Sequence, residues 1–362
     1  MKRVPQKQFL WYNAASDHNG EPNMIPIRLS TTAQNAYHDL VRSLYRSELG
    51  GTGGAAFREQ RGARAYWYER LRIGNTVKKR YLGEDNPETS AYMAERENQR
   101  ASTDQARAHQ ARLVRLLRAE GMTPTDTVSG PILYSMAKIG VFRMGGTIVG
   151  TQAFRLYEGE LGLQFTFDQL TQTGDIDIAQ FERLSLALGD EVEGSLAATF
   201  TDLEFAPVPS LKKNSVWRWR QSKSDTLVEF LTPSFRDEED IRDLKSLGVS
   251  AQSLHFLNYL IAEPIKAAAL YRSGVLVQIP RPERYAIHKL IVANRRQGGP
   301  DVTKSRKDRL QADFLIRALA VDRPEDLKAA YHDALSRGPK WQDHIRASLK
   351  LLEGAAKTLA AL

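Results

Sequence analysis

The sequence predicts an α+β protein, with a small mixed β-sheet between a helical N-terminal region containing a β-hairpin and a helical C-terminal subdomain. Two observations indicate this class. Short β-rich runs occupy most of residues 145–232, and apolar residues recur at helical spacing before and after them. A chain of 362 residues is longer than one ordinary core needs. We therefore expect three units, at residues 1–125, 126–235 and 236–362.

The N-terminal unit begins with a helix that we expect from Thr31 to Leu49, because apolar side chains recur there every three or four residues and Gly50 and Gly51 follow. A loop of small residues continues to Ala56. A second, long helix is expected over residues 88–120, which lack Pro and Gly. A third helix is expected over residues 129–142.

Between the first two helices, residues 65–83 predict a β-hairpin. Two β-rich runs are joined by Gly74 and Asn75, a pair typical of tight hairpin turns. The hairpin combines aromatic and basic residues, which stack on bases and pair with phosphates. Its candidate nucleic-acid contacts are Tyr66, Trp67, Tyr68, Arg70, Lys78, Lys79 and Arg80. The alternative is a hairpin that buries one aromatic face and exposes the other to solvent.

The C-terminal unit is expected to be mainly helical. A strand is predicted over residues 275–279, where four apolar residues surround one Gln and Pro280 follows. Helices are predicted near residues 238–246, 250–261, 283–296, 303–320, 324–336 and 340–361.

Composition excludes several kinds of site. The chain has no cysteine, so disulfides, thiolate zinc sites, Cys nucleophiles and iron–sulfur clusters are absent. The seven histidines are scattered without zinc-helix spacing. No run approaches the roughly 18 apolar residues of a membrane span, and the basic start lacks the apolar run of a signal peptide. These features favour a cytoplasmic protein without a membrane partner.

Charge is distributed unevenly along the chain. The net charge is +7 over residues 1–120, −5 over residues 121–235 and +6 over residues 236–362. An acidic centre between basic flanks is the charge pattern expected of a metal centre within a polyanion-binding surface. The alternative is an ordinary basic protein with uneven charge.

The candidate catalytic residues are three acids in β-rich runs. Asp175 and Asp177 alternate with Ile176 and Ile178, so on a strand the two carboxylates share one face. Two neighbouring carboxylates repel each other unless a cation lies between them. Glu229, between Val228 and Phe230, completes a triad if its strand lies beside the first. Three such acids hold two metal ions in phosphoryl-transfer enzymes, and oxygen ligands favour Mg²⁺ or Mn²⁺.

A glycine turn precedes these acids. Gly145 and Gly146 allow a tight backbone turn and close approach of a phosphate. Thr147 adds a hydroxyl donor, and residues 147–151 are expected to open a helix whose N-terminal amides favour an anion. Each feature has a structural alternative: a Gly-Gly pair is often only a turn, and an isolated acid is often an edge-strand charge. Their order in one chain favours a functional site. The sequence contains neither a nucleophile elbow nor a Walker A loop.

The order of Gly145-Gly146-Thr147, Asp175-Ile176-Asp177 and Glu229 resembles that of the nucleotidyltransferases of the DNA polymerase β superfamily. Over residues 130–320 the chain looks most like bacterial proteins near the AbiEii type, the toxins of type IV toxin–antitoxin pairs. A longer gap between Gly146 and Asp175 implies an inserted segment, and the third acid is Glu rather than Asp.

This resemblance implies a metal-dependent transfer of a nucleoside monophosphate from an NTP such as ATP to an acceptor. Asp175, Asp177 and Glu229 would be catalytic and metal-binding, while Lys289 and Lys307 would face the nucleotide with Gly145, Gly146 and Thr147. RNA or tRNA, a protein hydroxyl and a small molecule remain open as acceptors, and an antitoxin as a protein partner. A toxin-like nucleic-acid-binding module is the alternative function.

Overall fold

The computed structural model describes residues 27–50, 55–61, 64–73, 76–165, 174–182, 192, 195–210, 212, 215–235, 239–298 and 301–362. The predicted α+β class is confirmed. Helices and strands alternate through the centre of the chain, and the described residues after 279 form helices and no strand.

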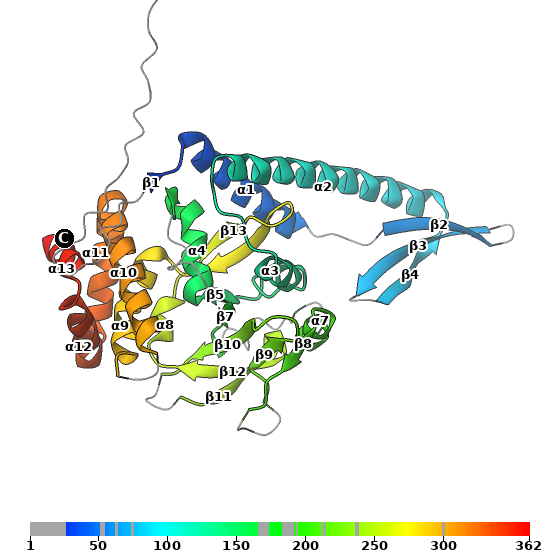
Figure 1. The fold of residues 1–362 in the computed structure, drawn as a ribbon. Helices are drawn as coiled ribbons and strands as arrows, with labels where there is room; N and C mark the ends of the chain where they lie inside the picture. The colour runs from blue at the N-terminus through cyan, green and yellow to red at the C-terminus, as the bar shows by residue number, and fades with distance from the viewer. Residues whose placement is uncertain are drawn as a thin grey trace, which may run out of the picture.

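A seven-stranded mixed sheet forms the centre of the molecule (Figure 1). Its main path runs β11–β12–β10–β7–β5, and β9 pairs with β10 on one side and β8 on the other. Strand β10 is parallel to β7 and β12, while β5 is antiparallel to β7. The strands are β5 (Thr147–Val149), β7 (Asp175–Ala179), β8 (Phe205–Pro207), β9 (Arg218–Gln221), β10 (Leu227–Pro233), β11 (Ile241–Leu244) and β12 (Val249–Leu254).

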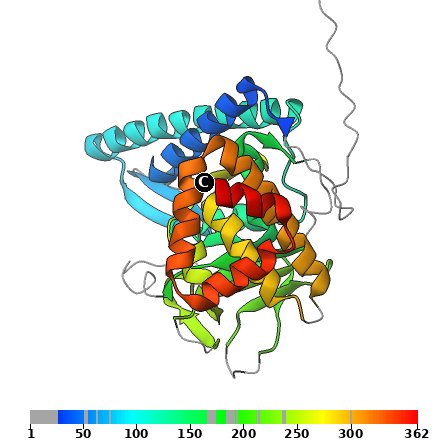
Figure 2. The ribbon, with the colours of Figure 1, turned by 90° about the vertical axis from the view of Figure 1, so that its left-hand side faces the viewer.

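Helices pack around this sheet and close its core. Ile176, Ile178, Val228 and Phe230 are completely buried at the centre of the sheet, where alternating apolar side chains belong to one hydrophobic cluster with the helices. Figure 2 shows the C-terminal helices in front of the sheet. The helices that contribute to this cluster are α3 (Ser129–Lys138), α4 (Gly150–Leu161), α7 (Leu196–Asp202), α8 (Leu257–Leu260), α9 (Pro282–Arg295), α10 (Val302–Asp322), α11 (Pro324–Ser336), α12 (Pro339–Leu349) and α13 (Glu353–Ala361).

A smaller cluster joins the N-terminal helices to a β-hairpin of the C-terminal part. Tyr37, Leu40 and Leu117 are buried there beside Leu276, and the Tyr37 hydroxyl accepts a hydrogen bond from the Ala268 amide at 3.1 Å. The elements concerned are α1 (Thr31–Gly50), α2 (Pro87–Ala119), β13 (Ile265–Ala269) and β14 (Val275–Ile279), with β1 (Ile27–Arg28) paired to β6 (Leu163–Gln164) nearby.

The N-terminal half of α2 leads to a three-stranded antiparallel sheet that projects from the body (Figure 1). Its strands are β2 (Ala55–Arg61), β3 (Arg64–Ile73) and β4 (Thr76–Glu84). The predicted hairpin is therefore confirmed, although its turn residues lie outside the described part of the chain. Strand β2 was not predicted. It pairs with β3 along the whole length of β2, from Ala55 opposite Arg70 to Arg61 opposite Arg64.

Four expected helices differ in the structure. Residues 238–246 and 250–261 contain β11, a 3-10 turn (Lys245–Leu247), β12 and the short α8 instead of two helices. The helix expected over residues 129–142 ends at Lys138, and the one expected over 340–361 is divided into α12 and α13. The expected helices near residues 31–49, 88–120, 283–296, 303–320 and 324–336 and the strand at 275–279 are confirmed. Of the helices that the structure describes, none has the length and apolar character needed to cross a membrane.

Candidate active site

The three predicted acids meet on adjacent parallel strands. Asp175 and Asp177 lie two residues apart on β7, with Ile176 fully buried between them. On β10, Glu229 stands directly opposite Asp177 in the register. Since side chains alternate along a strand, all three carboxylates belong to one face of the sheet. The alternating sequence pattern thus correctly placed the acids together.

These acids form one wall of a cavity of about 620 Å³. Helices α9 and α10 form the opposite wall, which is basic. The cavity is lined by five carboxylates and five cations. The carboxylates are Asp175, Asp177, Glu229, Glu239 and Asp308, and the cations are Lys289, Arg295, Arg296, Lys304 and Lys307. The cavity therefore brings the three candidate acids and both candidate lysines to one space.

Burial and mutual repulsion make the acidic wall unfavourable by itself. Burial, together with the neighbouring charges of Glu229 and Asp175, raises the pKa of Asp177 to about 7. Burial also raises the pKa of Glu229, whereas Arg218, whose Nη1 lies 3.7 Å from Glu229 Oε1, opposes this shift. A bound cation would relieve the repulsion between these carboxylates.

The donor set fits a metal ion that also binds its substrate. In the parts of the chain that the structure describes, no three His, Asp or Glu side chains converge to hold a metal ion without other ligands. The three-acid metal site expected from the sequence stays a prediction, and Glu229 lies near Arg218. Mg²⁺ in phosphoryl-transfer sites takes one or two carboxylates and completes its octahedron with phosphate oxygens and water. Asp175 and Asp177 supply ligands of that kind.

An ion-pair network holds the basic wall in place. Asp308, which is buried, accepts hydrogen bonds from Lys289 Nζ at 2.5 Å and from Arg296 Nη1 at 2.6 Å. Both interactions join α9 to α10. Burial and the nearby Lys289 lower the pKa of Lys307 to about 8. A polyanion in the cavity would stabilise the charged form of Lys307 and balance the excess of cations on this wall.

Gly150 connects strand β5 to helix α4 directly beside Asp177. Its φ is +63°, and a Cβ at this position would lie 2.2 Å from Asp177 Oδ2. The Tyr285 hydroxyl donates a hydrogen bond to the Gly150 carbonyl at 2.8 Å. Gly150 and Thr151, at the start of α4, line the cavity together with Asp175 and Asp177. This glycine fits the site because any other residue would displace the carboxylate.

The predicted phosphate turn lies elsewhere. Gly146 packs against Val141, whose carbonyl accepts a hydrogen bond from the Gly146 amide at 2.9 Å; a Cβ on Gly146 would lie 2.8 Å from that oxygen. Thr147 is 1% exposed, and its hydroxyl donates to the Gly145 carbonyl at 3.2 Å. None of Gly145, Gly146 and Thr147 is among the residues that line the cavity. The helix expected to open over residues 147–151 is corrected: Thr147 begins a strand, α4 begins at Gly150, and Gly150 is the glycine that borders the cavity.

The predicted nucleic-acid contacts lie on the projecting sheet and do not line the cavity. Tyr66 and Tyr68 occupy alternate positions of β3, whereas Trp67 lies between them and donates a hydrogen bond to Asp85 at 2.9 Å. The side chains of Arg70, Lys78, Lys79 and Arg80 lie outside what the structure describes.

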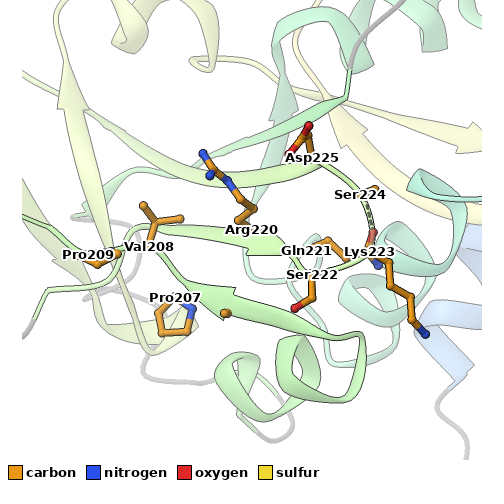
Figure 3. A pocket seen from close by; sticks show the side chains of 10 residues that line it. Pro207, Val208, Pro209, Arg220, Gln221, Ser222, Lys223, Ser224 and Asp225 are labelled. Atoms are coloured by element: carbon orange, nitrogen blue, oxygen red, sulfur yellow. Dashed lines mark hydrogen bonds between the residues drawn. The ribbon is translucent and has the colours of Figure 1, made fainter.

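A second hollow differs chemically from the cavity. It has about 490 Å³ and is formed by β8, β9 and the segment that follows β9 (Figure 3). Its only carboxylate is Asp225, which Figure 3 shows apart from Lys223. Because it lacks paired acids facing paired lysines, this hollow offers no comparable arrangement for a metal-bound phosphate.

Comparison with known proteins agrees with this geometry. The family model described as nucleotidyltransferase matches residues 127–336, more than half of the chain. The chain belongs to this nucleotidyltransferase family. It is accordingly a transferase of the nucleotidyl-transfer type. The projecting sheet and α2 precede the matched region.

One solved structure and the curated proteins complete the comparison. The structure titled "Crystal structure of an antigenic nucleotidyltransferase-like protein from Paracoccidioides brasiliensis" is 14% identical, with a TM-score of 0.30, and the match covers 62% of this chain and 95% of that one. No curated protein matches the chain. The expected nearness to AbiEii-type toxins stays a prediction.

Sequence reasoning missed Gly150, Thr151 and Arg218 as residues of the site. The signal for Gly150 was present, since three β-branched residues precede it and predict a short strand that ends at a glycine. Arg218 gave no sequence signal, because only the antiparallel pairing of β9 with β10 brings it opposite Glu229.

Proposed function

We propose that the cavity binds a nucleoside triphosphate with Mg²⁺ or Mn²⁺ and transfers its nucleoside monophosphate to an acceptor hydroxyl. One observation carries this proposal: three carboxylates on β7 and β10 face two lysines on α9 and α10 across a single cavity that Gly150 borders. A triphosphate with a divalent cation is the ligand whose charges match both walls.

The basic wall and α4 would hold the triphosphate. Lys289 and Lys307 act as positive point charges on its oxygens, and Arg296, fixed by Asp308, adds planar donors. The first amides of α4, a helix of 12 residues, favour the same negative charge. These groups position the phosphorus that reacts.

The acidic wall would supply the metal ligands and receive the proton. Asp175 and Asp177 would hold the cation, which neutralises charge on the phosphate oxygens when bound. The acceptor oxygen forms a bond to the α-phosphorus while the bond from that phosphorus to pyrophosphate breaks. Glu229, placed opposite Asp177 by the register, takes the proton of the acceptor hydroxyl. Arg218 beside Glu229 opposes the rise in pKa caused by burial and so favours the ionised carboxylate that accepts the proton.

The acceptor that we favour is RNA, tRNA included. The segments before and after the acidic centre carry net charges of +7 and +6, which suits a polyanionic acceptor better than a neutral small molecule. The salt dependence of transfer would reveal such an acceptor, because each neutralised phosphate releases counterions.

The test of the proposed function is transfer of label from each α-labelled NTP to total cell extract with Mg²⁺ or Mn²⁺. We expect label in the RNA fraction, and its loss with EDTA. Asp177→Asn should reduce the rate on the order of 100-fold or more, since several kcal/mol of charge stabilisation disappear. The matched control is Asp225→Asn, which changes an exposed aspartate of the second hollow. Equal rates for Asp177→Asn and the wild type would refute the assignment.

A further inference from the structure

The projecting sheet presents two chemically different faces. On one side Phe57 of β2 lies opposite Tyr68 of β3, with ring centroids 5.9 Å apart and planes inclined by 27°. Tyr66 occupies the next position of the same side, two residues earlier on β3. All three side chains are half-buried. We call Phe57, Tyr66 and Tyr68 the aromatic face.

The opposite side is tied to the start of α2. Trp67 and Arg58 face each other in the register, and both donate hydrogen bonds to Asp85, at 2.9 and 2.7 Å. Asp85 also accepts a hydrogen bond from Ser90 in the first turn of the helix. Trp67 therefore anchors the sheet to α2. Only Tyr66 and Tyr68 of the three consecutive aromatic residues belong to the aromatic face.

The sheet is strongly basic. Residues 55–84 contain eight Lys or Arg and three Glu. Arg64, which is exposed, follows the same strand alternation as Tyr66 and Tyr68, and its Nε lies 3.7 Å from Glu84 Oε1. Aromatic rings that take stacked bases, set among cations that take phosphates, are the two components of a single-strand-binding surface. Duplexes keep their bases stacked inside, so this face suits unpaired nucleotides.

Helix α2 places this surface far from the point where the helix contacts the body. Its contact with the body is marked by Gln110, which hydrogen-bonds Ser43 and Ser47 of α1. At about 1.5 Å per residue, the start of α2 at Pro87 lies roughly 35 Å from that contact. Figure 1 shows the sheet at the end of α2 that points away from the C-terminal helices. A ligand that reaches both the sheet and the cavity must be a polymer.

We propose that the aromatic face binds a single-stranded segment of the nucleic acid whose end enters the cavity as acceptor. The second half of this proposal rests on the proposed function, and the first half does not. The sheet would hold the acceptor at a distance from the reacting end and select polymers over nucleotides or small hydroxyl compounds.

The experiment measures binding of fluorescein-labelled U₂₀ RNA to the full-length protein by anisotropy, at several salt concentrations. The double variant Tyr66→Leu/Tyr68→Leu should bind roughly tenfold more weakly or worse, because stacking is lost. The matched double variant Tyr66→Phe/Tyr68→Phe keeps the rings and should bind within about twofold of the wild type. Arg64→Gln should make the slope of log affinity against log salt less steep by about 0.7 if it neutralises one phosphate.

Three results would overturn the proposal: equal binding by the Leu and wild-type proteins, equal loss by the Leu and Phe proteins, or tighter binding of a 20-base-pair duplex than of U₂₀. Melting temperatures of both double variants show whether the sheet remains folded. The two proposals can fail separately, and Asp177→Asn, which should lose nucleotide transfer, should bind U₂₀ as the wild type does. If the wild type binds U₂₀ but transfers no nucleotide, the proposed function fails and the binding surface stands. If the wild type transfers nucleotide but does not bind U₂₀, the reverse holds.

Discussion

Both the backbone conformation and the contact with Asp177 require a glycine at position 150. The backbone adopts φ +63°, and the space of a Cβ is filled by Asp177 Oδ2 at 2.2 Å. A left-handed φ alone costs a non-glycine residue about 1 kcal/mol, whereas the contact forces the carboxylate to move. The site thus depends on the absence of a side chain as much as on the acids themselves.

Gly150→Ala should therefore impair catalysis more than folding. We expect transfer to fall on the order of 100-fold, because small misplacements of catalytic groups have effects of that size. Gly248→Ala is the matched control: its φ is +65°, but nothing lies within 4 Å of the added Cβ. Both variants should lose about 1 kcal/mol of unfolding free energy, measured in urea. If Gly248→Ala lost as much activity, backbone strain rather than the Asp177 contact would be responsible.

His288 makes stability depend on pH. It is buried in α9, and burial, followed by the charge of Lys289, lowers its pKa to about 3 from 6.5. Between these pH values the unfolded chain binds a proton that the folded chain does not, so stability falls as pH falls from 6.5 toward 3. The loss from this residue is about 2 kcal/mol between pH 6.5 and 5. His288→Leu should show a correspondingly smaller decrease in unfolding free energy; an unchanged decrease would contradict the buried neutral histidine.

Helices α9 and α10 are joined by ion pairs at Asp308. The carboxylate is 4% exposed and joins Lys289 and Arg296 to α10. Lys289 also lies 5.2 Å from the centre of the Tyr285 ring, whose hydroxyl bonds Gly150. One chain of contacts therefore runs from the basic wall through α9 to the glycine beside the acidic wall.

Removing the charge of Asp308 should loosen the two helices. Asp308→Asn leaves two cations near one neutral amide, and we expect a loss of about 3 kcal/mol in unfolding free energy. Adding Lys289→Met removes one uncompensated charge, so the double variant should lose less than the sum of the single variants. Glu353→Gln, which breaks the exposed pair with Lys357 on α13, should be nearly neutral. Additive losses would show that Asp308 and Lys289 act independently.

Elements with local patterns were predictable, and those made by distant pairing were not. Asp175–Ala179 alternates polar and apolar residues, and this period identified β7 and the face of both acids. Residues 249–254 combine Ala, Gln and Leu, which favour a helix, yet β12 forms because it pairs with β10 and β11. Buried Ser250, Ala251 and Ser253 are small enough for that packed position.

The residues of the site also divide into those predictable from local sequence and those placed by distant strand pairing. Glu229 was identified from one acid in an apolar run, and its pairing with Asp177 followed from the sheet. The phosphate turn was placed at Gly145 and Gly146 because adjacent glycines are the stronger local signal. Only the antiparallel register of β5 with β7, in which Val149 faces Asp177, shows that the next residue, Gly150, is the one beside the carboxylate.

Over the whole molecule, the two hydrophobic clusters define what must fold together. The described residues of the projecting sheet and of the first half of α2 contribute to neither cluster, although Ala65 and Met93 are buried locally. Helix α2 contributes to the smaller cluster only from Leu113 onwards, and Leu40 and Leu44 of α1 belong to the same cluster. The projecting part is therefore attached to the catalytic body through one helix and should be separable from it.

Replacing residues 51–104 by a short Gly/Ser linker tests this separation. Because both clusters remain complete, and Gln110 still reaches Ser43 and Ser47, we expect the melting temperature to change by only a few degrees. NTP binding, measured by calorimetry with Mg²⁺, should be unchanged, since every residue lining the cavity is retained. Binding of U₂₀ should fall at least tenfold, as for the stacking variants. Loss of NTP binding in a variant that still melts cooperatively would show instead that the projecting sheet supports the catalytic cavity, and that the molecule does not divide at α2.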